Sequence, residues 1–363
     1  MRLFQNYGGF PPYFSQHRRD RKDAVTFKSE VARRLDSGYG AVHLLAPVLK
    51  VDDTAFFTYG DDEALQRSWA REKGMAAKGG LAEILLAQIE SHRTEVIYNL
   101  DPMRYGSDFV RRLPGCVKKT VAWRAAPSPG ADFSAYDLVV CNFPGILRTF
   151  RERSWKAAYF SPSHDPSMDE YAGNDDRPID VLFVGGYSRH HMRSAAVLEA
   201  VAGLGDRYRI QFRLACGRFT RLAESPLGYL APLGKHRRPK DIRAVAGKPV
   251  YGRDLYALIS KAKIILNGAI DMSGEERGNM RCFESMGCRS LLLSDEGMYP
   301  EGMVAGQTLI TYRSSSDVVG RLEELLRTPQ FVAGIADAGY KMVSSRYSKE
   351  RQWSTFKEMV GRL

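Results

Sequence analysis

Short apolar runs alternate with amphipathic segments along most of the chain. In the first half, runs with the composition of buried strands occupy residues 2–7, 41–48, 95–100, 119–124, 137–143 and 157–160. Between several of them, apolar residues recur at helical spacing, as at residues 27–35 and 81–89. This alternation of strands and helices predicts a parallel sheet that is covered by helices on both faces.

The rhythm breaks at residues 161–178, which read SPSHDPSMDEYAGNDDRP. A stretch so rich in Pro, Ser, Asp, Asn and Gly indicates an interdomain linker, which we place at residues 166–178. A second alternating series follows, with strands expected at residues 179–184, 209–216, 263–267, 289–294 and 308–312. Helical patterns lie at residues 190–203, 253–262 and 279–286, and they fill the chain from 317 onward with a break near 328–329.

Two series of this kind predict two α/β domains, and a chain of 363 residues is about two domains long. We expect two doubly wound, Rossmann-like domains, the first over residues 1–165 and the second over residues 179–347. Ligands of open parallel sheets bind at the carboxyl ends of the strands. The default binding site is therefore a central cleft that both domains face.

Composition and charge limit the classes of binding partner more than they limit the fold. Apolar residues make up 44% and charged residues 26%, which excludes a disordered or fibrous chain. The formal net charge is +11, and residues 171–363 carry +8 of it. Such an excess favours nucleotide phosphates, an anionic membrane surface or nucleic acid. The basic stretch 235–243, KHRRPKDIR, has no interleaved aromatic residues and no nucleic-acid motif beside it, so it fits a solvated loop or an anionic lipid surface better than nucleic acid.

The cysteines and the apolar runs bear on location. The five cysteines are Cys116, Cys141, Cys216, Cys282 and Cys288. Their odd number and the lack of a CxxC pair argue against a disulfide framework and a zinc site, and favour a reducing cytoplasm. No apolar signal region opens the chain and no run approaches 18 apolar residues, so we expect no signal peptide and no spanning helix. Any membrane contact would be peripheral, at the inner face of a membrane.

The first candidate site is the turn after the expected strand 179–184. Gly185 and Gly186 end this strand before a helix, so backbone N–H groups and a helix N-terminus could meet an anion. The residues here that could donate to phosphate oxygens are Ser188, Arg189 and Arg193. The alternative is a plain turn that needs glycine only for positive φ. A shared metal at His190 and His191 is disfavoured, because adjacent helical residues point about 100° apart.

The second candidate site is residues 274–288, GEERGNMRCFESMGC. Glu276 and Glu284 would share one face if a single helix carried both. If Gly278 instead ends a loop and a helix starts near Asn279, Glu276 lies in the loop and Glu284 on the second turn. Glu284 could then accept hydrogen bonds from a ribose diol, and Arg281 could neutralise a phosphate or pair with Glu284. The alternative is an amphipathic helix with solvated charges.

Further candidates lie near the ends of other expected strands. Gly8 and Gly9 follow the first strand, where a simple turn is equally consistent. Asp101 follows the strand 95–100 and could be a general base, or it could cap a helix that begins at the next residue. His164 lies instead in the polar segment 161–178 and could face the cleft or form a turn. Asn267 closes the strand 263–267 and could bind a ligand or cap that strand.

Residues 279–295, NMRCFESMGCRSLLLSD, resemble the N-x-R-x-F-E-x-x-G donor-site stretch of GT-B glycosyltransferases in the spore-maturation-protein-like branch of group 1. The flanking segments agree in order. DVLFVG at residues 180–185 resembles the family's entry to its donor domain, and residues 251–256 and 264–267 resemble its G-x-x-x-Y and I-x-L-N segments. The similarity covers residues 178–348, whereas the first 160 residues match only in the order of strands and helices.

The resemblance implies a GT-B fold and metal-independent transfer from a nucleoside-diphosphate sugar, without a cofactor. Glu284 matches the residue that grips the donor ribose, and Glu276 lies at the spacing of one that contacts the donor sugar. The residues that the resemblance places around the diphosphate are Gly185, Gly186, Asn279 and Arg281, with Arg189 and Arg193 as the candidate cations. It also implies that the C-terminal helix, residues 348–363, packs back on the first domain.

The working hypothesis is a glycosyltransferase whose residues 1–165 bind the acceptor, a bacterial surface glycan or a lipid-linked precursor. Asp101 or His164 would be the base if the reaction inverts, and Glu276 would steady the sugar if it retains. A Glu284→Ala variant is expected to lose donor binding with little loss of fold. Two alternatives stay open, namely a nucleotide-sugar or glycan binding protein without transferase activity, and a basic nucleic-acid protein with strongly salt-dependent binding.

Overall fold

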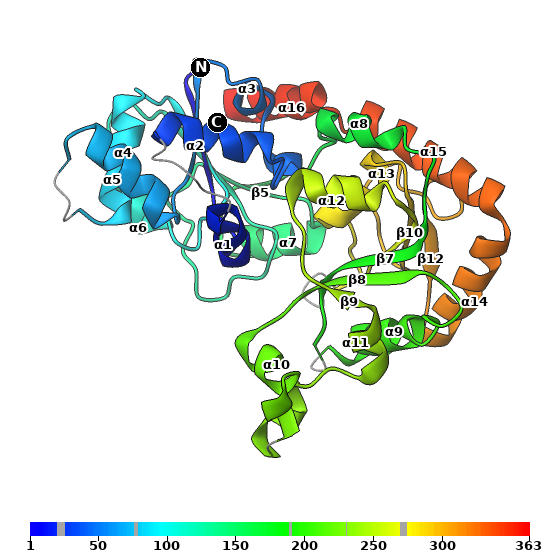
Figure 1. Cartoon of the computed structure of the whole chain (residues 1–363). Coiled ribbons are helices and arrows are strands. Elements are labelled where there is room, and N and C mark those ends of the chain that lie inside the picture. Colours follow the sequence, from blue (N-terminus) through cyan, green and yellow to red (C-terminus); the bar gives the residue numbers. More distant parts are fainter. Residues whose placement is uncertain (20–25, 76–78, 189–190, 230, 269–273) are drawn as a thin grey trace. The chain divides into compact units, whose positions relative to one another are not determined.

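The structure, a computed structural model, describes the chain except residues 20–25, 76–78, 189–190, 230 and 269–273. The chain forms two compact units. Unit 1 consists of Met1–Ser163 together with Lys349–Leu363, and unit 2 of His164–Ser348. Each unit is built on one six-stranded sheet (Figure 1). Among the described helices, none is both long enough and apolar enough to cross a bilayer.

The sheet of unit 1 has the strand order β2-β1-β3-β4-β5-β6, and all neighbours pair in parallel. Its strands are β1 (Leu3–Tyr7), β2 (Ala55–Tyr59), β3 (Val96–Asn99), β4 (Lys119–Trp123), β5 (Leu138–Cys141) and β6 (Ala157–Tyr159). Its helices are α1 (Pro11–Arg19), α2 (Phe27–Asp36), η1 (Ala41–His43), α3 (Ala46–Leu49), α4 (Glu63–Glu72), α5 (Leu81–Ser91), α6 (Ser107–Val110), α7 (Pro144–Glu152) and α16 (Lys349–Gly361). The winding direction changes between β1 and β3, which makes their carboxyl ends the topological switch point.

The sheet of unit 2 has the order β12-β11-β10-β7-β8-β9 and is also parallel throughout. Its strands are β7 (Ile179–Gly186), β8 (Ile210–Ala215), β9 (Ala246–Gly247), β10 (Ala262–Leu266), β11 (Leu291–Asp295) and β12 (Ile310–Tyr312). Its helices are η2 (Pro166–Met168), α8 (Asp169–Ala172), α9 (Met192–Ala202), α10 (Arg218–Ala223), η3 (Pro226–Tyr229), η4 (Ala231–His236), α11 (Lys240–Val245), α12 (Gly252–Ile259), α13 (Met280–Gly287), α14 (Ser315–Arg327) and α15 (Pro329–Arg346). The switch point lies between β7 and β10.

The apolar runs form strands because helices exclude water from both faces of each sheet. In unit 2, β11 is buried along its whole length, and Ile264, Leu266 and Leu293 share a core with residues of α9, α14 and α15. A strand buried on both faces has no polar alternation, as the sequence of such strands shows. The two parallel sheets and their helices confirm the expected α/β class with two Rossmann-like units.

One expected strand is wrong, and the strands β2 and β9 were not expected. Residues 41–48 are not extended but form η1 and α3, since Gly40 has a left-handed φ of 69° and Pro47 lies at the start of α3. An unbroken apolar run fits a buried helix as well as a buried strand. The strand that precedes α4 is instead β2, whose sequence AFFTY carries the aromatic and β-branched residues typical of strands.

The segment expected as a linker is folded into unit 2. Asp165 caps η2 through a hydrogen bond from the backbone N–H of Ser167, and α8 follows directly. Arg177 donates to the carbonyl oxygens of Ala262 and Cys288. The polar composition of residues 166–178 therefore reflects caps and turns rather than a free connection. The chain passes from one unit to the other at residues 163–164 and again at 348–349.

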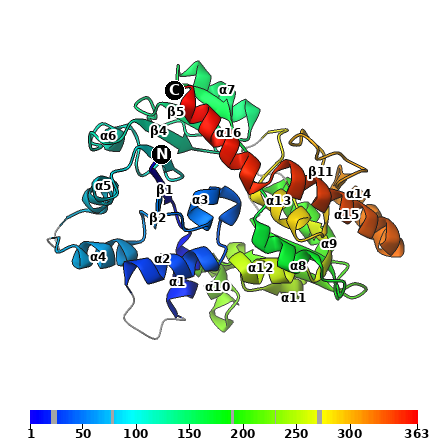
Figure 2. The same cartoon turned by 90° about the horizontal axis from the view of Figure 1, so that it is seen from above.

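Helix α16 belongs to unit 1 although 185 residues of unit 2 precede it. The Nζ of Lys349 is buried and donates to the carbonyl oxygens of Ala41 and Leu44, at 2.6 and 2.7 Å. Phe356 packs against Tyr98 with ring centroids 5.1 Å apart. Figures 1 and 2 both show α16 beside α3, so the last helix completes the core of the first unit.

Candidate functional site

The loop before α13 adopts the second of the two arrangements considered for Glu276 and Glu284. The helix begins at Met280, with Asn279 as its N-cap. Gly278 has a φ of 125°, which a residue with a Cβ rarely adopts. Glu276 lies in the preceding extended segment, where it forms an isolated bridge with Met298, and only Glu284 is on the helix. The two carboxylates therefore do not share a helix face.

Asn267 and Asn279 tie the start of α13 to the switch point. Nδ2 of Asn279 donates to Oδ1 of Asn267 at 3.2 Å, and Asn267 follows β10 directly. The carbonyl oxygen of Asn267 accepts from the hydroxyl of Tyr312, and its Nδ2 donates to Ser294 Oγ. The Asn279 side chain makes no capping hydrogen bond to α13, so it leaves the first N–H groups of this helix to other acceptors.

Arg281 and Glu284 form a close pair on α13. Nη1 of Arg281 lies 2.5 Å from Oε2 of Glu284, and both side chains are largely buried. Burial raises the pKa of Glu284, Arg281 opposes this shift, and Asp165 adds to it. Nε of Arg281 is buried without a hydrogen-bond partner in the described part of the chain. The pair therefore leaves one buried guanidinium N–H of Arg281 without an acceptor among the described residues.

The burial of Glu284 corrects one expectation. Its side chain is only 6% exposed, and removing one partner of a buried ion pair leaves the other charge uncompensated. A Glu284→Ala change would therefore lower the stability of the protein as well as weaken the binding of any ligand. Glu284→Gln, which keeps the size and one acceptor oxygen, is the better probe.

Arg277 is a residue of this region that the sequence did not single out. Its guanidinium donates to the carbonyl oxygens of Gly274 and Glu296, and it lies 2.7 Å from the carboxylate of Asp295 at the end of β11. A Cβ at Gly297 would come within 2.7 Å of this guanidinium. Arg277 thus holds the loop before α13 against the carboxyl edge of the sheet. Its position before Gly278 carried no signal that separates it from a solvated charge.

The glycine turn lies at the other side of the same switch point. Gly185 and Gly186 end β7, and neither has a left-handed φ, so the alternative of a turn that needs glycine only for positive φ is wrong. A Cβ at Gly185 would meet the ring of Phe183 at 2.8 Å, whereas the space around Gly186 is open. Glycine at 185 therefore accommodates packing, and glycine at 186 leaves the backbone exposed at the strand end.

Arg193 is the described cation nearest to this turn in sequence. It lies in the first turn of α9, and its Nη2 donates to the carbonyl oxygen of Arg313, which follows β12. Ser188 lies in the loop between β7 and α9, where its carbonyl oxygen accepts from the N–H of His191. Arg189 and His190 lie outside the described residues. The described cations at the carboxyl edge of unit 2 thus include Arg193 and Arg281.

In unit 1 the candidates also gather at the switch point. Gly8 and Gly9 follow β1 and Asp101 follows β3. A Cβ at Gly8 would come 3.0 Å from the Cβ of Asp101, and one at Gly9 would overlap the ring of Phe14. Asp61, which follows β2, accepts the N–H of Gly9 at 3.0 Å. Asp61 was not predicted, although a carboxylate two positions after the strand AFFTY was a readable signal.

The two carboxylates at this edge have unusual electrostatics. Burial raises the pKa of Asp101, which Arg104 opposes from 3.2 Å. Burial also raises the pKa of Asp61, and the charge of Asp101 adds to that shift. No helix begins after Asp101, since α6 starts at Ser107 with Gly106 as its N-cap, so the N-cap alternative is wrong. Raised carboxylate pKa values in one place are typical of functional sites.

His164 does not lie at a strand end. Its ring is buried, and its Nε2 lies 2.9 Å from Oδ1 of Asp169. A Cβ at Gly287 would come 3.0 Å from its Nδ1, and the ring of Tyr340 packs against it edge-on. The imidazole is therefore enclosed between α13 and α15, which argues against its role as a base for an acceptor. The local sequence could not show this, because Gly287 and Tyr340 are distant in the chain.

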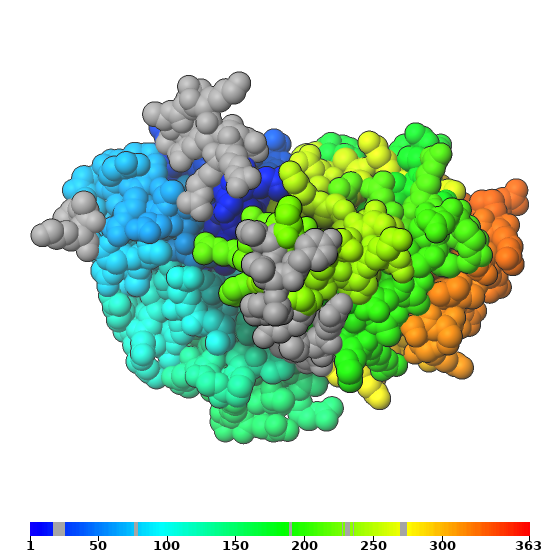
Figure 3. All heavy atoms as spheres, turned by 60° about the horizontal axis from the view of Figure 1, so that its bottom comes forward, coloured from blue at the N-terminus to red at the C-terminus, as the bar shows by residue number. Residues whose placement is uncertain are grey.

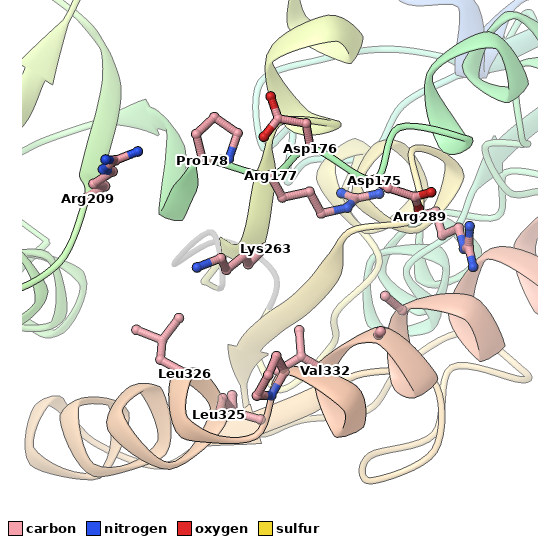
Figure 4. Close-up of a pocket in the computed structure, with 13 residues that line it drawn as sticks. Asp175, Asp176, Arg177, Pro178, Arg209, Lys263, Arg289, Leu325, Leu326 and Val332 are labelled. Carbon is pink, nitrogen blue, oxygen red and sulfur yellow. The ribbon is translucent and has the colours of Figure 1, made fainter.

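A cavity of about 500 Å³ opens at the opposite edge of the sheet of unit 2. Its lining includes Arg177, Arg209 and Lys263, which lie at the amino ends of β7, β8 and β10, and residues of α14 and α15. Figure 4 shows Leu325, Leu326 and Val332 opposite these charged residues. None of the predicted site residues lines this cavity. Within the described residues, no group of three side chains has the composition of a metal site.

Comparison with solved structures finds proteins with a similar fold. The chain resembles HepE of Anabaena in complex with UDP and glucose, with 14% identity over 99% of both chains and a TM-score of 0.59. It also resembles a glycosyltransferase of Rickettsia africae, with 12% identity over 99% of this chain and 97% of that one and a TM-score of 0.55. Part of TarM of S. aureus matches at 8% identity and a TM-score of 0.54, over 77% of this chain and 58% of TarM. The fold is that of the GT-B glycosyltransferases.

A sequence model supports the class independently of the fold. Residues 193–358 match the family described as "Glycosyl transferase-like". This stretch includes α9, α13 and the strands β8 to β12 of unit 2. No curated protein matches the whole sequence significantly. Together, the family match and the fold indicate that the chain is a glycosyltransferase.

Proposed function

We propose that the chain transfers a sugar from a nucleoside-diphosphate sugar to an acceptor hydroxyl, with the donor in unit 2 and the acceptor in unit 1. One observation carries the proposal. The N-cap residue of α13 turns its amide to Asn267, so its side chain does not cap the first N–H groups of α13 at the switch point of the sheet. A helix N-terminus left open in this way is suited to a diphosphate. HepE, which shares the fold, has been solved with UDP-glucose.

On the donor side, each described residue has a distinct role. Arg193 and Arg281 would offset the charge of the diphosphate, which is greatest as the sugar leaves. Glu284 would accept hydrogen bonds from the ribose, and its pair with Arg281 holds the carboxylate in place. Gly186 lets the backbone approach the ligand, since nothing lies within 4 Å of its Cβ position. Glu276 and the undescribed Arg189 remain proposed contacts of the sugar and the diphosphate.

On the acceptor side, we assign the general base to Asp101 and not to His164. A base must accept the proton of the attacking hydroxyl, and a carboxylate with a raised pKa does so more effectively. Asp101 has this property and lies beside Gly8 and Gly9 at a strand end. This role applies if the reaction inverts the sugar configuration.

The finer assignments rest on the sequence resemblance. We propose membership of the spore-maturation-protein-like branch, an acceptor that is a bacterial surface glycan or a lipid-linked precursor, and transfer without a metal or another cofactor. The charge of the leaving diphosphate would then be met by backbone N–H groups and arginines, as prearranged donors can do. The reaction would take place in the cytoplasm or at the inner face of a membrane.

The donor site is tested by a thermal-shift panel with UDP, GDP, ADP, CMP and their common sugar conjugates. One nucleotide at about 100 times its dissociation constant should stabilise the protein by about 2.7 kcal/mol. Glu284→Gln should lower this affinity roughly tenfold or more, since a neutral amide accepts more weakly from a ribose diol. Glu323→Gln, which alters an arginine-paired carboxylate on α14, is the matched control and should bind like wild type.

Turnover separates an enzyme from a binding protein on the same scaffold. The enzyme should hydrolyse its donor slowly even without an acceptor, whereas a binding protein should stabilise with the nucleotide and release no sugar. A flat nucleotide panel, with a shift for nucleic acid alone, would overturn the proposed function.

A further inference from the structure

Residues 217–240 carry much of the net charge of the chain. This segment reads GRFTRLAESPLGYLAPLGKHRRPK and has six basic residues but one acidic residue, so it contributes +5 to the total of +11. Six large apolar residues are spread through it. A high basic charge combined with Phe, Leu and Tyr is typical of segments that lie on membrane surfaces. The basic stretch 235–243 overlaps the end of this segment at residues 235–240, and residues 240–243 are helical in α11 rather than a loop.

The segment is folded and largely independent of the sheet. Its helices α10, η3 and η4 pack mainly on one another. Glu224, the acidic residue, accepts two hydrogen bonds of 2.6 Å from the guanidinium of Arg238 and so closes the segment. Ala223 is fully buried, and a Cβ at Gly228 would overlap its carbonyl group. The described residues 217–229 and 231–238, which we call the α10 hairpin, therefore form a defined structure.

The outer face of α10 combines apolar and basic side chains. Phe219 is 64% exposed and Leu222, three positions later, is 41% exposed, so the two lie on the same side of the helix. Arg218 and Arg221 are exposed beside them. Figure 3 looks onto unit 2 from the side of α10 and shows the light-green residues of the hairpin at the surface. Exposed Phe and Leu beside exposed arginines suit a partner that is both apolar and negative.

We propose that the α10 hairpin docks on an anionic lipid bilayer, with Phe219 and Leu222 entering the interface and the basic residues at the lipid phosphates. A bilayer offers both features over a wide area, whereas two apolar side chains are too small a patch for a stable protein interface. A second copy of the chain would bring like charges together. The inference concerns a surface that none of the predicted site residues belongs to, and it stands whether or not the chain transfers sugar.

The test is co-sedimentation of the full chain with vesicles of pure phosphatidylcholine and with vesicles that contain about 30% phosphatidylglycerol. The chain should bind the anionic vesicles at about 0.1 M salt and lose most binding at about 0.5 M, where charges are screened. Arg218→Gln with Arg221→Gln should lower the partition coefficient roughly 25-fold, since each arginine contributes about fivefold. Phe219→Ser with Leu222→Ser should lower it further at both salt concentrations, because apolar burial is not screened.

Matched controls distinguish an effect of the outer face of α10 from a general loss of surface charge or of exposed apolar area. Phe331→Ser removes an aromatic ring on α15 that is 50% exposed, and Arg327→Gln removes an exposed charge on α14. Both should bind vesicles like wild type. All variants should keep the nucleotide-induced thermal shift of wild type, which checks the fold of unit 2 separately. No binding to anionic vesicles, or binding that the α10 variants and the controls reduce equally, would overturn the proposal.

Discussion

At the scale of single residues, the buried carboxyl groups of Asp101 and Asp61 lower the stability of the folded protein when they are ionised. Burial raises the pKa of both carboxyl groups, so the ionised forms are less favourable in the folded protein than in the unfolded chain. Their contribution to stability is present below the unfolded pKa and is lost as the pH rises through the folded pKa. At neutral pH the charges therefore cost stability, which is common where a site serves a reaction.

Replacing Asp101 should separate activity from stability. We expect Asp101→Asn to lower kcat by roughly 10² to 10⁴, the usual contribution of a general base. The variant should be no less stable than wild type in urea at pH 7, because a buried charge is removed, and it should bind nucleotide normally. Asp108→Asn, which alters a fully exposed side chain on α6, should change none of these quantities. Unchanged kcat in Asp101→Asn would show that another residue accepts the proton.

At the scale of elements, α16 depends on one buried ammonium group. Lys349 is 2% exposed and donates to two carbonyl oxygens near η1, and Gln352 donates to the carbonyl oxygen of Ser161. These bonds come one turn apart, so they fix both the position and the rotation of the helix. Apolar packing of Phe356 then buries the rest of this face. Stability of unit 1 should therefore respond to Lys349 more than to the exposed lysines.

Lys349→Met keeps the length of the side chain but removes its donors. It should lower the free energy of unfolding by about 2 to 3 kcal/mol, since two buried carbonyl oxygens lose a charged partner. Lys357→Met, on the exposed side of the same helix, should change it by less than about 0.5 kcal/mol. Urea unfolding followed by tryptophan fluorescence measures both, and equal stability of the two variants would contradict the structural role of Lys349.

At the scale of the whole molecule, the two units have separate cores and should unfold in two transitions. Lowering the pH should decrease the stability of unit 1. Burial, with the charge of Lys349, lowers the pKa of His43 to about 3, so the stability from its neutral form is present above pH 6.5 and is lost as the pH falls toward 3. This loss amounts to about 2 kcal/mol between pH 7 and pH 5.

Calorimetry should therefore show two transitions that respond to different conditions. Lowering the pH from 7 to 5 should lower the Tm of unit 1 more than that of unit 2, and His43→Gln should weaken that dependence, unlike His191→Gln at an exposed position. The nucleotide found by thermal shift should raise only the transition of unit 2. A single transition that nucleotide and acid move together would contradict two independent cores.

The order of strands and helices was readable from the sequence, because period and composition are local properties. Ile179–Gly186, Leu291–Asp295 and the helix from Met280 followed from apolar runs, glycines and one resemblance. Residues 41–48 were misread, since an apolar run without alternation fits a buried helix and a buried strand equally, and the strand at residues 55–59 was not expected at all. The segment 166–178 was misread as well, because capping residues and linker residues have the same composition.

What the sequence determined by itself is thus the α/β class, the presence of two units, and the residues that follow β1, β3, β7 and β10. Only the tertiary structure decided which of these residues act together. It enclosed His164 between α13 and α15, brought the side chain of Asn279 to that of Asn267, and brought Asp61 to the N–H of Gly9. The reason is physical. Propensity and period depend on neighbours in the chain, whereas burial, pKa and hydrogen-bond partners depend on residues that only the folded sheets bring together.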